Sequence, residues 1–122
     1  MPHLTLEVSK HLPIADETEL LLKLNTALYQ SGQFKHSKDI KSRLYRTDGY
    51  LIGFGNDGTH QDGEHFVVAH LCILKGRSDE IKAKLVGCVM ATLQNYISPH
   101  VAGVQYAVNL TELADVYQKA IV

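Results

Sequence analysis

The sequence has no surplus of charge of either sign and only two cysteines. Its 12 lysines and arginines nearly balance 13 aspartates and glutamates, which gives a net charge of −1 at pH 7. A nucleic-acid-binding domain would carry a basic patch or stripe, so the composition argues against such a partner. Two cysteines build no disulfide framework. Because Cys72 and Cys88 lie inside apolar segments, we expect reduced, buried thiols and a cytoplasmic protein.

The sequence also lacks a long apolar run. The longest one, residues 85–93, is far too short to cross a bilayer as a helix. The first 25 residues contain six charged side chains and no continuous apolar core, so no secretory signal is expected. We therefore predict one domain, residues 1–122, with no membrane partner.

Hydrophobic periodicity predicts two β-α-β units in series. Strands are expected over residues 2–8, 40–47, 65–75 and 101–110, and helices over 16–32, 78–98 and 111–122. Residues 50–54 either extend the second strand or form a short one, and residues 55–64 are a polar loop. The half-repeats cover about 2–54 and 65–110, followed by the tail 111–122. Right-handed crossovers then predict an α+β fold, a four-stranded sheet with two helices on one face.

Both long helices have clear end signals. Asp16 and Glu19 form a capping-box pattern, and Gly32 suits the position just after the first helix. Ser78 is a good N-cap for the second helix, and Pro99 ends it.

The strand predicted at 65–75 is apolar on both faces. Alternation places Val67, Ala69, Leu71 and Ile73 on one face, and Phe66, Val68, His70, Cys72 and Leu74 on the other. A strand buried on both faces needs cover on both sides. The two helices cover one face, so we expect another copy of the chain to cover the second.

The opening Met1-Pro2 is the main catalytic candidate. A methionine before a small residue is normally trimmed, so we expect Pro2 to be the mature amino terminus. Its free secondary amine, held on a rigid ring, is a compact base when neutral. Burial and nearby cations lower an amine pKa, which brings it toward the pH where general acid–base catalysis is most effective.

Three basic residues could bind an anion, and two of them, Arg43 and Arg77, could also supply those cations. Lys41 and Arg43 share one face of the second strand, two residues apart. Arg77 precedes the second helix, where a guanidinium beside free N–H groups makes a good carboxylate site. The alternative for each is a solvated surface position.

Five stretches carry a resemblance to a known family: Met1-Pro2-His3-Leu4, the leucine-rich first helix, Ile40-Lys41-Ser42-Arg43, Val68-Ala69-His70 and Gly76-Arg77-Ser78. With these landmarks, nearly the whole chain resembles the 5-carboxymethyl-2-hydroxymuconate isomerase family of the tautomerase superfamily. That superfamily includes 4-oxalocrotonate tautomerase and macrophage migration inhibitory factor. The chain departs from the family at Lys41, where arginine is common, in a slightly shorter segment before Arg77, and in the loop 55–64.

The resemblance implies a homotrimer of double β-α-β subunits whose uncovered sheet faces meet. It also implies an isomerase that moves a proton in an unsaturated 2-hydroxy (2-oxo) dicarboxylic acid, such as 5-carboxymethyl-2-hydroxymuconate. Pro2 is then the catalytic base and acid, and Lys41, Arg43 and Arg77 bind the substrate carboxylates. No cofactor or metal is needed for this chemistry.

Alternatives remain open at this stage. Other proline-based reactions, such as phenylpyruvate tautomerisation or hydration of an unsaturated acid, suit the same residues. A non-catalytic trimer that binds a small anion or another protein is the alternative from a different class.

Other candidate motifs are weaker. Residues 53–58 match G-x-G-x-x-G, but no helix is expected to follow, so dinucleotide binding is rejected. His60, His65 and His70 would alternate between strand faces and would not converge on zinc. We expect His70 to be a core histidine, and His3 either to tune Pro2 or to lie on the surface.

Overall fold

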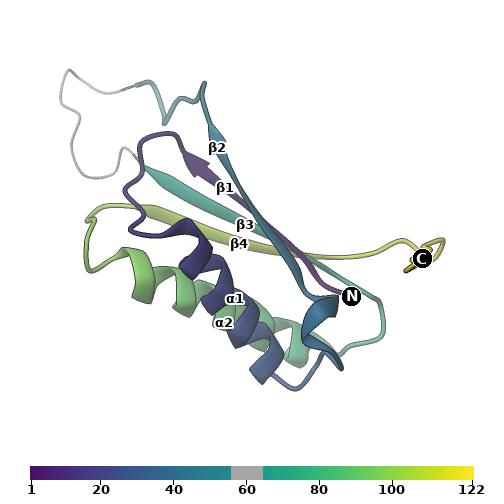
Figure 1. The fold of residues 1–122 in the computed structure, drawn as a ribbon. Helices are drawn as coiled ribbons and strands as arrows, with labels where there is room; N and C mark the ends of the chain where they lie inside the picture. The colour runs from purple at the N-terminus through teal and green to yellow at the C-terminus, as the bar shows by residue number, and fades with distance from the viewer. Residues whose placement is uncertain (56–64) are drawn as a thin grey trace.

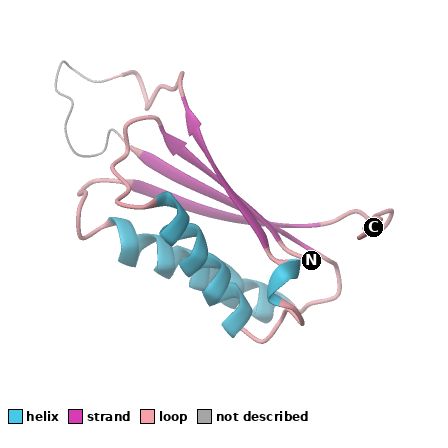
Figure 2. Cartoon of the chain, viewed as in Figure 1, coloured by secondary structure: helices cyan, strands magenta, loops and turns pink. Residues whose placement is uncertain are grey.

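The computed structural model describes residues 1–55 and 65–122, which form a four-stranded sheet with two helices on one face (Figures 1 and 2). In chain order the elements are β1 (His3–Ser9), α1 (Glu17–Gln30), the 3-10 helix η1 (Ser37–Asp39), β2 (Lys41–Thr47), β3 (Phe66–Ile73), α2 (Asp79–Ile97) and β4 (Gln105–Glu112). The loop predicted at 55–64 lies almost wholly outside the described residues, and so does half of the G-x-G-x-x-G match.

The strand order is β2-β1-β3-β4. Strand β1 is parallel to β2 and β3 is parallel to β4, which confirms the predicted repeat, while the central β1–β3 pair is antiparallel. His3 faces both Lys41 and Cys72 across the sheet, and Cys72 faces Thr111. The starts of β1 and β2 and the ends of β3 and β4 therefore lie side by side at one end of the sheet, which we call the Pro2 end.

The core lies between the sheet and the helices. Strand side chains of one face are fully buried there, because the alternation of each strand turns its apolar set toward α1 and α2. The contributing residues are Leu4, Leu6 and Val8 from β1, and Val67, Ala69, Leu71 and Ile73 from β3. The helices add Leu20, Leu24 and Leu28 from α1, and Leu85, Val89, Leu93 and Ile97 from α2.

The helix boundaries follow the predicted end signals. The Asp16 carboxylate accepts a hydrogen bond from the Glu19 backbone at 3.1 Å, and the Ser78 hydroxyl accepts one from Ile81 at 3.2 Å. These bonds satisfy backbone N–H groups that the first helical turn leaves free. Gly32 has φ +80°, the left-handed conformation in which glycine commonly ends a helix.

Two secondary-structure predictions were wrong. Residues 111–122 form no helix: β4 continues to Glu112, which pairs with Ile73, and Leu113 donates a further backbone bond to Ile73 at 2.7 Å. Sheet pairing wins here because a helix of about 12 residues is marginal without tertiary support. Residues 50–54 form no strand, although Tyr50 packs edge-on against Phe66 with ring centroids 5.4 Å apart.

The second face of the sheet has no cover within the described chain (Figure 2). It carries half-buried or exposed side chains, among them Phe66, Val68 and Cys72 of β3. His70 also lies on this face, with Nε2 3.8 Å from the Glu7 carboxylate, so the prediction of a core histidine was wrong. Among the described residues, no helix is long and apolar enough to cross a membrane.

Candidate active site

Pro2 is buried at the start of β1. Its carbonyl oxygen accepts a hydrogen bond from the Lys41 backbone N–H at 3.1 Å, which extends the parallel β1–β2 pairing by one residue. A proline is tolerated there because the first strand residue needs no ladder donor. With Met1 attached, the Pro2 nitrogen is an amide; without Met1 it would be a free amine at the start of β1.

Lys41 reaches the amino terminus from the neighbouring strand. Its Nζ donates to the Asp39 carbonyl oxygen at 3.1 Å and lies 4.0 Å from the Met1 sulfur. Burial lowers the pKa of Lys41, and the nearby Lys119 ammonium adds to the lowering. Met1 therefore occupies space beside a cation that was predicted to bind substrate.

Arg43 lies next along the same face of β2. Its guanidinium is 3.4 Å from His3 Nδ1 and 3.5 Å from the Thr5 hydroxyl, both on β1. These distances exceed the usual range for N–H hydrogen bonds, so both contacts are weak. Burial lowers the pKa of His3, and the charges of Arg43 and Lys41 lower it further. Arg43 thus lies beside His3 and favours the neutral form of its ring.

Arg77 is held more firmly, at the turn between β3 and α2. Its guanidinium donates to the Gln33 carbonyl at 2.7 Å and to the Gln33 side chain at 3.3 Å. It also stacks 5.0 Å from the centre of the Phe34 ring. Arg77 therefore joins the α1–η1 connection to the β3–α2 turn, and its charge is fixed in position.

Lys41, Arg43 and Arg77 differ from the other half-buried cations because they lack a carboxylate partner in the described chain. Five lysines and arginines in the described chain are half-buried: Lys41, Arg43, Arg46, Arg77 and Lys82. Arg46 pairs with Glu17, and Lys82 pairs with Asp79 and Glu112. Within residues 1–55 and 65–122, the other three have no carboxylate within salt-bridge distance. A half-buried cation without a counterion is suited to an anionic ligand.

The charges around the amino terminus act on its proton affinity. Burial is the largest effect and lowers the pKa of the Met1 amino group. The Asp39 carboxylate raises this pKa, and three cations lower it: Arg77, Lys119 and Lys41. The structure thus brings Lys41 and Arg77 close enough to act on the amino terminus, whereas Arg43, which was expected with Arg77 to supply this charge, acts on His3 instead.

Asp39 and Lys119 are neighbours of the site that sequence reasoning missed. The Lys119 ammonium donates to the Asp39 carboxylate at 3.0 Å, although the residues are 80 positions apart in the chain. This hydrogen bond is the largest cause that lowers the pKa of Asp39. No local pattern could have found the pair, because it depends on the path of the tail.

Comparisons with known proteins agree with this geometry. A scan against protein families matches residues 2–120 to 5-carboxymethyl-2-hydroxymuconate isomerase. The chain belongs to the 5-carboxymethyl-2-hydroxymuconate isomerase family. It is therefore an isomerase of the tautomerase type. A search of curated proteins found no match.

Solved structures support the family assignment. A 5-carboxymethyl-2-hydroxymuconate isomerase from Deinococcus radiodurans R1 is 29% identical, with TM-score 0.82 over 97% of this chain and 88% of that one. A 5-carboxymethyl-2-hydroxymuconate delta-isomerase is 17% identical, with TM-score 0.84 over 100% and 89%. A fused 4-OT described as a symmetric trimer is 19% identical, with TM-score 0.69 over 97% and 90%. The last two show the shared fold.

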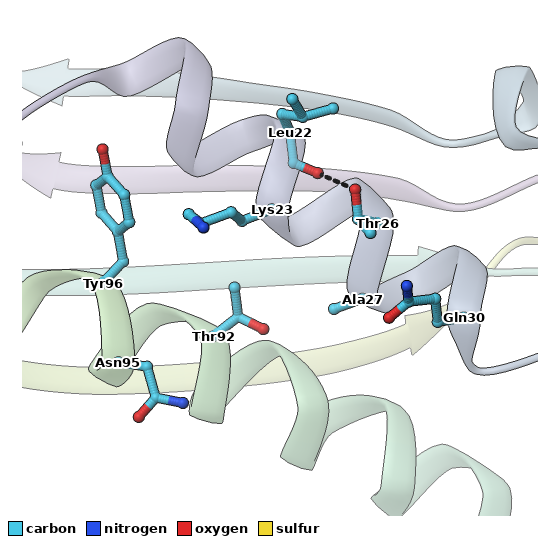
Figure 3. A pocket seen from close by; sticks show the side chains of 8 residues that line it. All are labelled: Leu22, Lys23, Thr26, Ala27, Gln30, Thr92, Asn95 and Tyr96. Atoms are coloured by element: carbon cyan, nitrogen blue, oxygen red, sulfur yellow. Dashed lines mark hydrogen bonds between the residues drawn. The ribbon is translucent and has the colours of Figure 1, made fainter.

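A separate groove lies between α1 and α2, remote from the residues of the isomerase site. Figure 3 shows its lining side chains, which come only from the two helices: Leu22, Lys23, Thr26, Ala27, Gln30, Thr92, Asn95 and Tyr96. The groove holds about 510 Å³ but contains none of the predicted site residues. Its size alone does not connect it with the isomerase chemistry.

No cluster of potential metal ligands occurs among residues 1–55 and 65–122. His60 lies outside the described residues. His65 Nδ1 is 3.1 Å from the Ser9 hydroxyl, and His70 lies on the uncovered sheet face beside Glu7.

Proposed function

We propose that the chain isomerises an unsaturated 2-hydroxy acid with at least two carboxylates, such as 5-carboxymethyl-2-hydroxymuconate, with Pro2 as general base and acid after removal of Met1. The observation that carries this proposal is a buried Pro2 with three half-buried cations near it that have no carboxylate partner in the described chain. Lys41 and Arg77 act on the amino terminus, and Arg43 acts on His3. A dicarboxylate would provide the missing negative charges.

The proposed reaction needs only one proton carrier. The neutral Pro2 nitrogen takes the proton from the 2-hydroxyl group, and the conjugated double bonds shift as the oxygen becomes a carbonyl. The protonated amine then returns a proton to a carbon at the far end of the conjugated system. Atoms and charge balance without an oxidant or a cofactor. General acid–base catalysis of this kind typically contributes about 10²–10⁴-fold.

The cations would orient the substrate and keep the base neutral. Lys41 lies beside the amino terminus and Arg43 beside His3, both on β2, and Arg77 approaches from the β3–α2 turn. A positive surrounding disfavours a second positive charge on the amine and favours carboxylate binding. Lysine at position 41 keeps the charge but loses the bidentate fork of arginine, so this contact would be less directional than in relatives with arginine.

We further propose that the chain works as a homotrimer in the cytoplasm. The uncovered sheet face carries the partly apolar side of β3, and a relative with the same fold is described as a symmetric trimer. Two free thiols, Cys72 and Cys88, suit a reducing compartment.

The decisive experiment compares one preparation before and after treatment with methionine aminopeptidase, with intact mass to follow Met1. Ultraviolet spectroscopy would follow enol-to-keto conversion of 5-carboxymethyl-2-hydroxymuconate and of phenylpyruvate. We expect activity on the dicarboxylate only after Met1 is lost, and most of it to disappear in Pro2→Ala. Full activity with Met1 attached would exclude Pro2 as the base. Faster turnover of phenylpyruvate would favour a different proline-based activity, and no turnover of either would favour a non-catalytic binding protein.

A further inference from the structure

The C-terminal tail crosses the Pro2 end of the sheet. The tail leaves β4, one edge strand of the sheet, at Glu112. Its Lys119 binds Asp39, which lies two residues before β2, the opposite edge strand. Figure 1 shows the C-terminus at the same end of the molecule as the N-terminus. Three strand spacings of about 4.8 Å separate the edges, roughly 14 Å, and seven residues span up to about 23 Å. The tail is long enough to pass the ends of β3 and β1 on its way.

The tail is fixed at both ends of this crossing. Near its start, Asp115 pairs with Lys75 at 3.0 Å, and both side chains are largely exposed. Near its end, the Asp39–Lys119 pair is better shielded, with side chains 26% and 31% exposed. Ile121 then lines a shallow surface pocket together with His36 and Asp39.

Lys119 thus lies among the charges of the Pro2 site. Its partner Asp39 also holds Lys41 through the backbone carbonyl. Lys119 contributes to the electrostatic environment of Lys41, His3 and the amino terminus. The single carboxylate of Asp39 balances only one of the two ammonium groups of Lys41 and Lys119. A dicarboxylate bound there would therefore meet both groups in one cluster.

We propose that Lys119 is an additional substrate-binding residue of the Pro2 site, brought there by the tail and held in place by Asp39. This inference rests on the proposed function, because it takes the Pro2 site as the place where a dicarboxylate binds. It assigns to the tail a role in choosing dianions over monoanions: an extra ammonium group strengthens binding of a second carboxylate more than binding of a single one.

The test measures binding and does not need catalysis. Adipate, a six-carbon dicarboxylate, and hexanoate, its monocarboxylate counterpart, are titrated calorimetrically into the full chain with Met1 removed and into its Pro2→Ala variant. We expect Lys119→Gln to weaken adipate binding by roughly 3- to 10-fold and hexanoate binding much less. Lys119→Arg should keep the adipate affinity, because it keeps the charge and can still pair with Asp39.

Lys75→Gln is the matched control, since it breaks a tail ion pair of the same length away from Asp39. Unchanged adipate affinity in Lys119→Gln, or equal losses in Lys119→Gln and Lys75→Gln, would overturn the proposal. Because binding is measured also in Pro2→Ala, failure of the proline mechanism leaves the result for Lys119 interpretable. With substrate, Lys119→Gln should raise KM with little change in kcat.

Discussion

Two arginines of β2, three residues apart, should respond differently to substitution by glutamine. One substitution should lower the stability of the fold, and the other should lower activity. Arg43 lies on the uncovered face beside His3, whereas Arg46 lies on the helix face. The Arg46 guanidinium binds Glu17 at 2.7 Å and the carbonyl oxygens of Lys10 and Leu12 at 2.9 Å each. It therefore ties the β1–α1 connection to β2, while Arg43 makes only weak contacts at 3.4 and 3.5 Å.

The magnitudes follow from these contacts. Arg46→Gln removes two short charge-assisted bonds to carbonyl groups and an ion pair whose carboxylate is 44% exposed. Counting the ion pair at its low surface value, we expect a loss of about 2–4 kcal/mol in the free energy of unfolding. Arg43→Gln should cost less than about 1 kcal/mol of stability, because its contacts lie beyond normal hydrogen-bond length. It should instead lower kcat/KM about 10- to 100-fold, the value of one charged hydrogen bond to substrate.

Urea denaturation at one fixed protein concentration gives the stability of each variant, since an oligomer unfolds in a concentration-dependent way. Ultraviolet kinetics with the dicarboxylate substrate, on protein without Met1, gives kcat/KM. Arg43→Lys should fall between wild type and Arg43→Gln, because lysine keeps the charge but not the fork. The reasoning fails if Arg43→Gln destabilises the fold as much as Arg46→Gln, or if it leaves kcat/KM unchanged.

Two further predictions concern the base and the subunit contact. The amine must be neutral to act, so kcat/KM falls as pH drops through its pKa. The Lys41 charge lowers the pKa of the Met1 amino group and should act in the same direction on a free Pro2 amine, so Lys41→Gln should move the acid limb of the pH profile to higher pH. A shift of the acid limb to lower pH would contradict the prediction that the Lys41 charge lowers the pKa of the amine. Val68→Glu places a charge opposite Glu7 on the uncovered face and should yield monomers in sedimentation, whereas Lys84→Glu on the exposed side of α2 should not. Trimers of Val68→Glu would argue against this interface.

Strand alternation alone is sufficient to separate the two faces of β2. Side chains two residues apart share a face, so the sequence predicts Lys41 and Arg43 together and places Arg46 on the other side with Leu44. What alternation cannot supply is the environment of each face. In sequence Arg46 resembles a surface charge, yet it binds carbonyl groups of the β1–α1 connection, because that connection folds back over the end of β2.

The tail shows the opposite case, in which local sequence misleads. Local patterning predicts a helix over residues 111–122, but their course is set by contacts with residues distant in sequence. Glu112 continues the pairing with β3, Asp115 binds Lys75, and Lys119 binds Asp39. Each contact joins the tail to another part of the chain, so no window of neighbouring residues contains the information. The prediction for His70 fails for a related reason, since an apolar strand does not reveal which of its faces the chain leaves uncovered.

The site itself follows from the register of two parallel strands. Because β1 and β2 pair with His3 opposite Lys41 and Thr5 opposite Arg43, the buried proline before β1 meets the first cations of β2 without any loop to place them. A shift of the pairing by one residue would turn both cations toward the helices and leave the amine without them. Ile40 and Leu44 oppose that shift, since it would move them from the core side to the uncovered face. The packing that stabilises the fold thus also fixes the distance between base and cations.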